Sequence, residues 1–164
     1  MGGADNRLWY FAYGSNMQRA TFVGRREMRP MESSWGRLDD FELCFDLPVG
    51  PGERGVANIT RRAGASVHGV LHLISAIEAD RLDRTEGVHR GLYDRLAVDI
   101  MAADGAAVAA FTYCSRHGTS GRKASPRYMG LLLEGAREHG LPVSYQSYLV
   151  ALPLAVDERE PSGD

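Results

Sequence analysis

Apolar runs separated by polar, glycine-bearing turns predict strands in the first two thirds of the chain and helices in the last third. Residues 8–13 are dense in aromatic side chains and end at Gly14, which indicates a buried first strand followed by a tight turn. The segment 47–54 carries two prolines and two glycines, so a surface loop is expected there. Further strands are expected at 29–45, as two strands around Gly36-Arg37, and at 55–60, 66–74, 92–102 and 106–115, with 61–65 and Asp104-Gly105 as connections.

Capping signals mark where the helices begin and end. Ser75 and Glu78 form a capping box, in which the side chain of each residue accepts a hydrogen bond from the backbone amide of the other. A helix is therefore expected over 76–85. Gly87 stops this helix soon after Glu86, because glycine readily adopts the left-handed conformation that ends a helix. We therefore expect a short helix with an acidic residue at its exit.

The last third of the chain predicts two more helices. Ser125-Pro126 is a helix start with proline at the first helical position, and Gly140 and Pro142 end that helix. Residues 143–151 predict a last short helix, whereas 17–23 has only weak helical character. Strands and helices are thus segregated instead of alternating regularly, which indicates an α+β fold.

Length and composition narrow the architecture and the function. The 164 residues fit one domain, expected over 8–154, with a flexible N-terminus at 1–7 and a flexible tail at 155–164. A net charge of -2 with both signs scattered argues against nucleic-acid binding. No signal peptide is visible and no run approaches the roughly 18 apolar residues of a membrane span, so we expect a cytoplasmic protein without membrane contact. Cys44 and Cys114 are interpreted as small buried hydrophobic residues and not as a disulfide.

Two local features are candidates for chemistry. The turn Tyr13-Gly14-Ser15-Asn16 follows a buried strand, where unpaired backbone amides can bind an anion or an oxyanion, although the same residues also fit a plain turn. Glu86 lies between apolar Leu82 and Val88, where partial desolvation would raise its pKa toward that of a general base. A glutamate near a helix end also fits a solvated surface charge, and Asp83 is the neighbouring candidate.

Other catalytic patterns fit poorly. His68 and His72 share a strand face but lack a convincing third ligand, which favours packing over a zinc site. Ser15 lacks the Gly-x-Ser-x-Gly elbow of a hydrolase nucleophile. Gly50-Pro51-Gly52 is followed by neither Gly-Lys nor a helix, so no nucleotide site is expected.

Seven short motifs add a resemblance that spans about residues 8–152. They are YFAYGSNM at 10–17, GVANI at 55–59, VHGV at 67–70, LDxxEGV at 82–88, Tyr93, SPxY at 125–128 and GAxExGLP at 135–142. In this order and spacing the chain resembles the γ-glutamylcyclotransferases. The resemblance implies a small mixed β-barrel with flanking helices, in which the Tyr13 to Asn16 turn lines a cavity for a γ-glutamyl group.

The resemblance also implies roles for individual residues. Glu86 matches the family's catalytic glutamate. The residues that match its substrate-binding turn are Tyr13, Gly14, Ser15 and Asn16. Tyr93 and Tyr128 match tyrosines near the pocket, where they either contact the substrate or only pack.

The implied reaction converts a small-molecule γ-glutamyl amide to 5-oxoproline without a metal or an organic cofactor. The substrate's own α-amine attacks the γ-carbonyl, and one carboxylate is sufficient to move both protons. Alternatives are an amidohydrolase that uses Ser15 as nucleophile, a binding protein without turnover, and a cyclotransferase that removes a γ-glutamyl protecting group during natural-product synthesis. Asn16 after Ser15 places the chain nearer the γ-glutamyl amino acid branch of the family, with the leaving amine still open, and symmetric pairs are common enough to suggest a homodimer.

Overall fold

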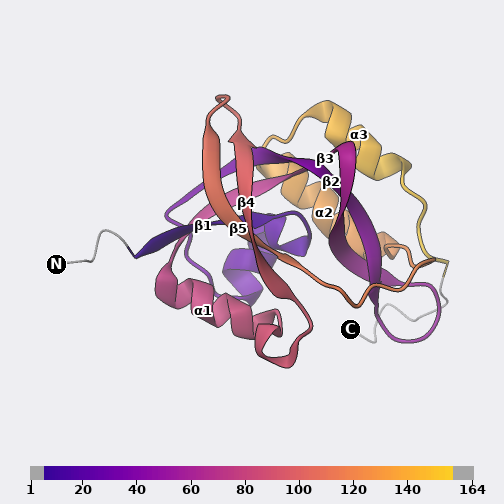
Figure 1. The fold of residues 1–164 in the computed structure, drawn as a ribbon. Helices are drawn as coiled ribbons and strands as arrows, with labels where there is room; N and C mark the ends of the chain where they lie inside the picture. Colours follow the sequence, from indigo (N-terminus) through magenta and orange to yellow (C-terminus); the bar gives the residue numbers. More distant parts are fainter. Residues whose placement is uncertain (1–5, 157–164) are drawn as a thin grey trace.

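The computed structural model describes residues 6–156, which form a closed barrel of five strands with helices packed around it (Figure 1). Neighbouring strands follow the order β1-β3-β2-β4-β5, and β1 closes the barrel by pairing parallel to β5, whereas the other pairs are antiparallel. The strands are β1 (Arg7–Ala12), β2 (Glu32–Pro48), β3 (Gly55–Ser75), β4 (Asp94–Ala102) and β5 (Ala107–Cys114). The predicted α+β fold with a small mixed barrel is confirmed.

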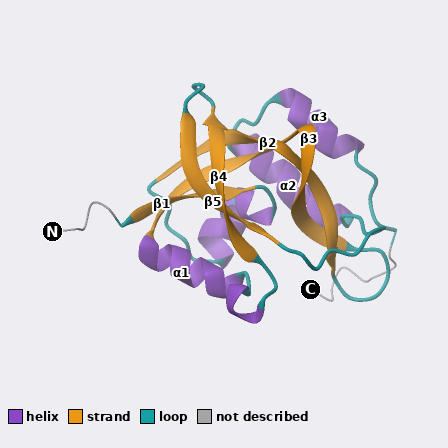
Figure 2. Ribbon diagram, viewed as in Figure 1, coloured by secondary structure: helices purple, strands orange, loops and turns teal. Residues whose placement is uncertain are grey.

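Within residues 6–156, three α-helices and three short helical turns surround the barrel. The helices are α1 (Ala76–Thr85), α2 (Pro126–Glu138) and α3 (Val143–Ala151), and the turns are η2 (Ser15–Met17), η3 (Ala20–Arg25) and η4 (Val88–Arg90). In Figure 2, α2 and α3 lie together at one side of the barrel and α1 lies apart from them. Within the described residues, no helix has the length and apolar character needed to cross a membrane.

The capping signals located the α-helices well. Ser75 is the N-cap of α1, and its hydroxyl accepts a hydrogen bond from the Glu78 amide at 3.1 Å. Ser125 caps α2 in the same way by accepting from Tyr128 N. The weakly helical segment 17–23 divides between a 3-10 turn in η2 and a π-helical turn in η3.

The prediction of two strands within residues 29–45 is wrong. Gly36 and Arg37 lie inside the single strand β2 and pair with both β3 and β4. Gly36 occurs here because a side chain would collide with a neighbouring strand: an added Cβ would lie 2.5 Å from Ile100 Cγ2. The glycine therefore marks a close approach inside the barrel, not a turn.

The predicted break at 61–65 is also wrong, because β3 continues through it. The register of the β2–β3 pair shifts between Asp39 and Phe41, so residues 62–65 bulge out of the ladder opposite Asp40. Asp40 has a positive φ of 65°, and its carboxylate accepts from Gly64 N at 3.0 Å. The polar residues that suggested a loop therefore form an irregularity within one long strand.

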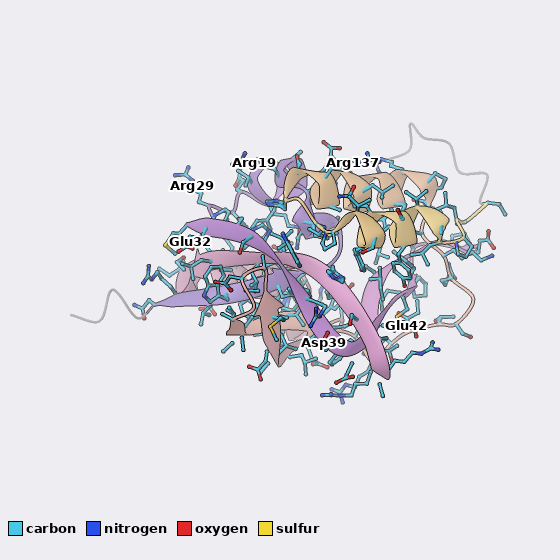
Figure 3. The ribbon with its side chains drawn as sticks, turned by 90° about the horizontal axis from the view of Figure 1, so that it is seen from above. Arg19, Arg29, Glu32, Asp39, Glu42 and Arg137 are labelled. Carbon is cyan, nitrogen blue, oxygen red and sulfur yellow. The ribbon has the colours of Figure 1, made fainter. Side chains whose placement is uncertain are left out.

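The core fills the barrel and extends beneath the helices. Fully buried side chains include Phe11, Ile59, Leu71, Ile100 and Leu132, and labelled charged residues such as Arg19 and Glu42 lie around the outside (Figure 3). The two cysteines are free and only partly buried. Of the ends expected to be flexible, residues 1–5 and 157–164 lie outside the described part, whereas Arg7 belongs to β1 and Ala155 N donates to Ala124 O.

Candidate active site

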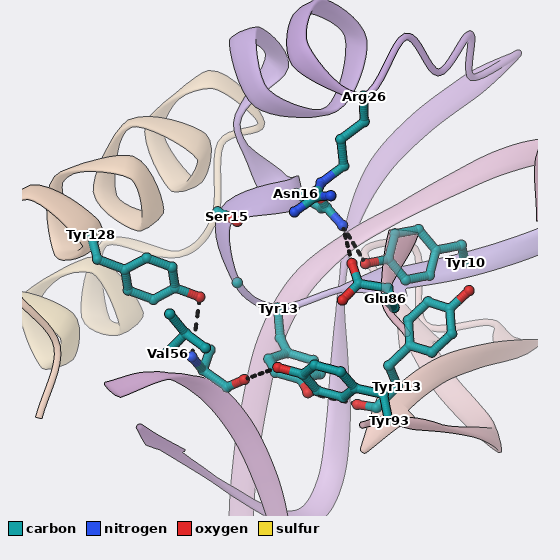
Figure 4. A pocket seen from close by; sticks show the side chains of 12 residues that line it. Tyr10, Tyr13, Ser15, Asn16, Arg26, Val56, Glu86, Tyr93, Tyr113 and Tyr128 are labelled. Atoms are coloured by element: carbon teal, nitrogen blue, oxygen red, sulfur yellow. Dashed lines mark hydrogen bonds between the residues drawn. The ribbon is translucent and has the colours of Figure 1, made fainter. Parts of the chain in front are cut away.

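A cavity of about 170 Å³ opens where β1 ends, beside the end of α1 (Figure 4). Its lining contains all seven residues singled out from the sequence, which are Tyr13, Gly14, Ser15, Asn16, Glu86, Tyr93 and Tyr128. Five more line it, namely Tyr10, Arg26, Val56, Ala57 and Tyr113. The fold therefore brings together side chains that are more than one hundred residues apart in sequence.

The turn after β1 is held from both sides. An added Cβ at Gly14 would lie 3.0 Å from the Tyr128 hydroxyl oxygen and 3.3 Å from Ala57 Cβ, so glycine lets the cavity walls approach. On the other side, buried His72 Nε2 lies 3.1 Å from the Asn16 carbonyl oxygen, and its Nδ1 lies 2.8 Å from Ser33 Oγ. Because a carbonyl only accepts, Nε2 carries the proton.

His72 supports the turn as a neutral ring. Its imidazole stacks on Phe22 with ring centroids 4.2 Å apart, and burial lowers its pKa to about 4. His68 instead contacts Tyr145 with ring centroids 4.6 Å apart. Within residues 6–156, no group of three His, Cys, Asp or Glu side chains is arranged to hold a metal ion.

Glu86 reaches the cavity because α1 ends there. Its backbone amide still donates to Leu82 O, and Gly87 then turns the chain with a φ of 74°. An added Cβ at Gly87 would lie 2.7 Å from Leu92 Cδ1, so positive φ and close packing both favour glycine. Burial raises the pKa of the Glu86 carboxyl, opposed by the charge of Arg26 and a hydrogen bond from Asn16.

Asn16, Arg26 and Glu86 form what we call the charged wall of the cavity. Asn16 Nδ2 donates to Glu86 Oε1 at 3.2 Å and to the Tyr10 hydroxyl at 3.0 Å. Arg26 Nε donates to Asn16 Oδ1 at 2.6 Å, which fixes the amide orientation. The asparagine amide thus bridges a cation and a carboxylate, and no described residue donates to Glu86 Oε2.

Arg26 is positioned by unusual backbone geometry. It follows the π-helical turn η3, and the next residue, Glu27, has a positive φ of 55°. The Arg81 side chain of α1 donates to the carbonyl oxygens of Arg26 and Glu27, at 3.2 and 2.6 Å. The helix that ends in Glu86 therefore also holds the segment that carries Arg26.

Tyr93 and Tyr128, with the backbone of Ala57, form the opposite side, which we call the tyrosine wall. The β2–β3 register shifts between Cys44 and Leu47, so the peptide groups of Ala57 fall at an irregular position in the ladder. The Tyr93 hydroxyl donates to Ala57 O at 3.0 Å, and the Tyr128 hydroxyl accepts from Ala57 N at 3.1 Å. The two tyrosines replace a partner strand for this residue.

The remaining tyrosines are also tied to the framework. The Tyr13 hydroxyl donates to Tyr113 O at 2.6 Å, and the Tyr113 hydroxyl donates to Asp83 Oδ1 at 2.6 Å. Asp83 also accepts from Arg95 Nε at 2.8 Å. Asp83, the second carboxylate considered from the sequence, therefore anchors Tyr113 and is absent from the cavity lining.

The sequence analysis did not assign Arg26, Tyr10, Tyr113 or the Val56-Ala57 backbone to the site. Tyr10 and Val56-Ala57 fall within motifs that carry the resemblance, and membership in these motifs is a sequence signal for them. Arg26 lies in a run of arginines with no distinguishing local pattern. Its place in the cavity is decided by η3 and by Arg81.

Comparison with known proteins agrees with this geometry. The model of the AIG2-like family matches residues 66–149. A gamma-glutamylcyclotransferase from Homo sapiens is 30% identical over 158 residues, covering 92% of this chain and 81% of the relative. One from Bos taurus is 33% identical over 144 residues, covering 85% and 76%. The chain belongs to the γ-glutamylcyclotransferase family.

The solved structures agree with the membership in this family. A structure of a gamma-glutamyl cyclotransferase matches with a TM-score of 0.82 and 27% identity, covering 94% of this chain and 92% of the other. The predicted family and the predicted kind of enzyme are confirmed. The cavity of this γ-glutamylcyclotransferase offers one partly buried carboxylate, one cation and hydrogen-bonding backbone, a set suited to binding a zwitterion and moving protons.

Proposed function

We propose that the cavity converts a γ-glutamyl amide to 5-oxoproline and a free amine, with Glu86 as the proton carrier. The observation that carries this proposal is the environment of the Glu86 carboxylate. One oxygen is fixed by Asn16, the other has no donor among the described residues, and burial raises the pKa of the group. A carboxylate with a raised pKa and one oxygen left for a ligand suits general base and general acid steps.

The reaction needs no nucleophile from the protein. The substrate's α-amine nitrogen attacks the γ-carbonyl carbon, which forms the lactam C–N bond and places negative charge on the carbonyl oxygen. Glu86 takes one proton from the α-ammonium before attack and a second from the same nitrogen after the ring has closed. It delivers both to the leaving nitrogen, which departs as an ammonium when the original amide C–N bond breaks. Atoms and charges balance without a further reactant, and the cavity contributes chiefly by folding the substrate for attack.

The turn from Gly14 to Asn16 is the proposed cradle for the γ-glutamyl group. The first main-chain hydrogen bond of this turn runs from Met17 N to Gly14 O. The backbone amides of Ser15 and Asn16 therefore do not donate within the turn. These amides border the cavity that Glu86 enters. They are suited to hold the substrate's carboxylate or its carbonyl oxygen.

Ser15 is assigned to this cradle and not to nucleophilic attack. In the part of the chain that the structure describes, no histidine or carboxylate makes a hydrogen bond to Ser15 Oγ, and His72 bonds instead to the Asn16 carbonyl. A serine without a neighbouring base is a weak nucleophile. Hydrolysis through Ser15 would also release glutamate in place of 5-oxoproline.

A panel of γ-glutamyl amides tests the proposal and identifies the leaving amine. The panel contains γ-glutamyl-alanine, glutathione, γ-glutamyl-ε-lysine and a γ-glutamylated aminoglycoside, each followed by release of 5-oxoproline and of glutamate. We expect 5-oxoproline from at least one compound, with γ-glutamyl-alanine favoured because Asn16 follows Ser15 in the turn. Release of glutamate would support the Ser15 amidohydrolase, and silence across the panel would contradict turnover altogether.

A further inference from the structure

The charges of the cavity have a defined order. Among its twelve lining residues, Arg26 is the only cation and Glu86 the only carboxylate. The side chain of Asn16 lies between them, accepting from Arg26 Nε at 2.6 Å and donating to Glu86 Oε1 at 3.2 Å. A positive and a negative group therefore stand on either side of a single amide.

Arg26 has unused hydrogen-bonding capacity. A guanidinium presents five N–H donors in a fixed planar fork, and only the Nε donor is engaged by a residue within 6–156. The terminal nitrogens Nη1 and Nη2 have no acceptor among these residues. In Figure 4, the Arg26 side chain extends toward Asn16 above the Glu86 carboxylate.

We propose that Arg26 binds the α-carboxylate of the γ-glutamyl substrate through its free guanidinium nitrogens. This inference rests on the proposed function and extends it. The α-carbon of a γ-glutamyl group carries a carboxylate and an ammonium as neighbours, which matches a cation and a carboxylate separated by one amide. With the α-carboxylate on Arg26, the α-ammonium faces Glu86, to which it delivers its proton.

This assignment also gives the two oxygen-bearing groups of the substrate separate binding partners in the cavity. The α-carboxylate no longer requires the amides of the Gly14 to Asn16 turn, which are left to the γ-carbonyl oxygen where negative charge develops. Arg26 then selects the substrate by its carboxylate. A guanidinium held by Asn16, and by Arg81 through the backbone, is preorganised for a planar anion and needs little reordering on binding.

The test compares two substrates that differ only in this carboxylate. γ-Glutamyl-alanine cyclises to 5-oxoproline, and 4-aminobutyryl-alanine, which lacks the α-carboxylate, cyclises by the same attack to 2-pyrrolidinone. Wild-type protein should prefer γ-glutamyl-alanine in kcat/KM by roughly 10³-fold or more, because a site built around a polar group rejects analogues that lack it. Comparable rates on both substrates would overturn the proposal.

Arg26→Ala separates carboxylate binding from a structural role. We expect its kcat/KM to fall roughly 10³-fold with γ-glutamyl-alanine but less than about 5-fold with 4-aminobutyryl-alanine, and guanidinium ion to restore part of the loss. Arg25→Ala, a change at the exposed neighbouring arginine, is the matched control and should behave as wild type. Equal losses on both substrates would show that Arg26 acts only by holding Asn16.

A binding measurement keeps the inference independent of turnover. By calorimetry, 5-oxoproline should bind wild type and Glu86→Gln more tightly than 2-pyrrolidinone does, and Arg26→Ala should lose this difference. Arg26→Lys replaces Arg26→Ala if the latter does not fold, and should weaken the preference by losing the planar fork. Carboxylate-selective binding without turnover would reject the proposed reaction but support carboxylate binding by Arg26. Turnover without selectivity for the carboxylate would support the reaction and reject the role of Arg26.

Discussion

The charged wall and the tyrosine wall face each other across the cavity, yet they use their polar atoms differently. On the charged wall, Asn16 connects Arg26 and Glu86, and each of the two ions keeps polar atoms without a partner in the described chain. On the tyrosine wall, both hydroxyls are engaged by the Ala57 backbone. The charged wall retains hydrogen-bonding atoms for a ligand, whereas the tyrosine wall uses its hydroxyls mainly to pair the backbone of the barrel.

The two tyrosines are themselves not equivalent. Tyr93 donates its hydroxyl proton to Ala57 O, whereas Tyr128 accepts from Ala57 N and also makes hydrogen bonds with Ser15. Burial raises the pKa of Tyr128 to about 12, so it remains protonated near neutrality. Tyr93 is thus tied to the barrel, whereas Tyr128 joins the barrel to the turn that carries Ser15.

The largest expected effect lies on the charged wall. Glu86→Gln keeps the size of the side chain and an oxygen that can accept from Asn16 Nδ2, but it cannot take up a proton from the α-ammonium. We expect kcat to fall by roughly 10² to 10⁴-fold, the usual contribution of a general acid-base group. Release of 5-oxoproline by the purified variant measures this, and a wild-type rate would remove Glu86 from the mechanism.

The control for Glu86→Gln is Asp80→Asn on the same helix. Asp80 is an exposed carboxylate that is absent from the cavity lining, and its Oδ1 lies 3.7 Å from Arg95 Nη2. Exposed ion pairs contribute little to stability, so this variant should keep both its fold and its rate. Equal losses in the two variants would point to damage of α1 in place of lost proton transfer.

The tyrosine wall should show the opposite balance of effects. Tyr93→Phe leaves Ala57 O without its donor, so we expect the free energy of unfolding to fall by about 1–3 kcal/mol. Its kcat/KM should change less than roughly 10-fold, because no proton is lost from the reaction path. Urea denaturation and steady-state kinetics on the same preparations measure both quantities.

Tyr128→Phe sharpens this contrast. It deprives Ala57 N of an acceptor and should cost a similar amount of stability, but it also removes a hydroxyl that bonds to Ser15 in the proposed cradle. We therefore expect its KM to rise more than that of Tyr93→Phe. A large loss of kcat without a loss of stability in either variant would contradict the division between the two walls.

The sequence carried the parts of the site that depend on local conformation. Gly14 and Gly87 mark backbone that must turn or pack closely, and serine caps mark the starts of α1 and α2. These local signals predict the turn and the helix that leads to Glu86, whereas their assignment to a site came from the resemblance to the family. The continuity of β2 and β3 was missed, because Gly36 and residues 61–65 imitate breaks. Only pairing between distant strands reveals them as a close approach and a bulge.

The position of Arg26 could not be predicted from the sequence. Its direction depends on a π-helical turn, on the positive φ of Glu27 and on a clamp from Arg81, more than fifty residues away. None of these leaves a pattern among the neighbouring arginines. The charge order of the cavity was therefore invisible until tertiary structure placed Asn16 between its two ions.

The smallest expected effect concerns the free energy of unfolding. It tests whether the ionised Glu86 of the charged wall destabilises the fold. The folded-state pKa of Glu86 is raised above the ordinary 4.5 by burial, so its stabilising contribution is complete below pH 4.5 and is lost as pH rises through the raised pKa. Glu86→Gln escapes this loss. Its free energy of unfolding relative to wild type should therefore increase between pH 4.5 and neutrality.

Asp39 provides the comparison of opposite sign. A hydrogen bond from Arg37 lowers the pKa of Asp39, so this carboxylate stabilises the fold above its ordinary pKa, and the contribution is lost as pH falls. Asp39→Asn should thus become less stable relative to wild type as pH rises toward the ordinary pKa of 3.8, whereas Glu86→Gln becomes more stable relative to wild type above pH 4.5. If both differences moved in the same direction across urea titrations that run from below pH 3.8 to neutrality, Glu86 would be an ordinary ion-paired carboxylate and not a desolvated one held ready for proton transfer.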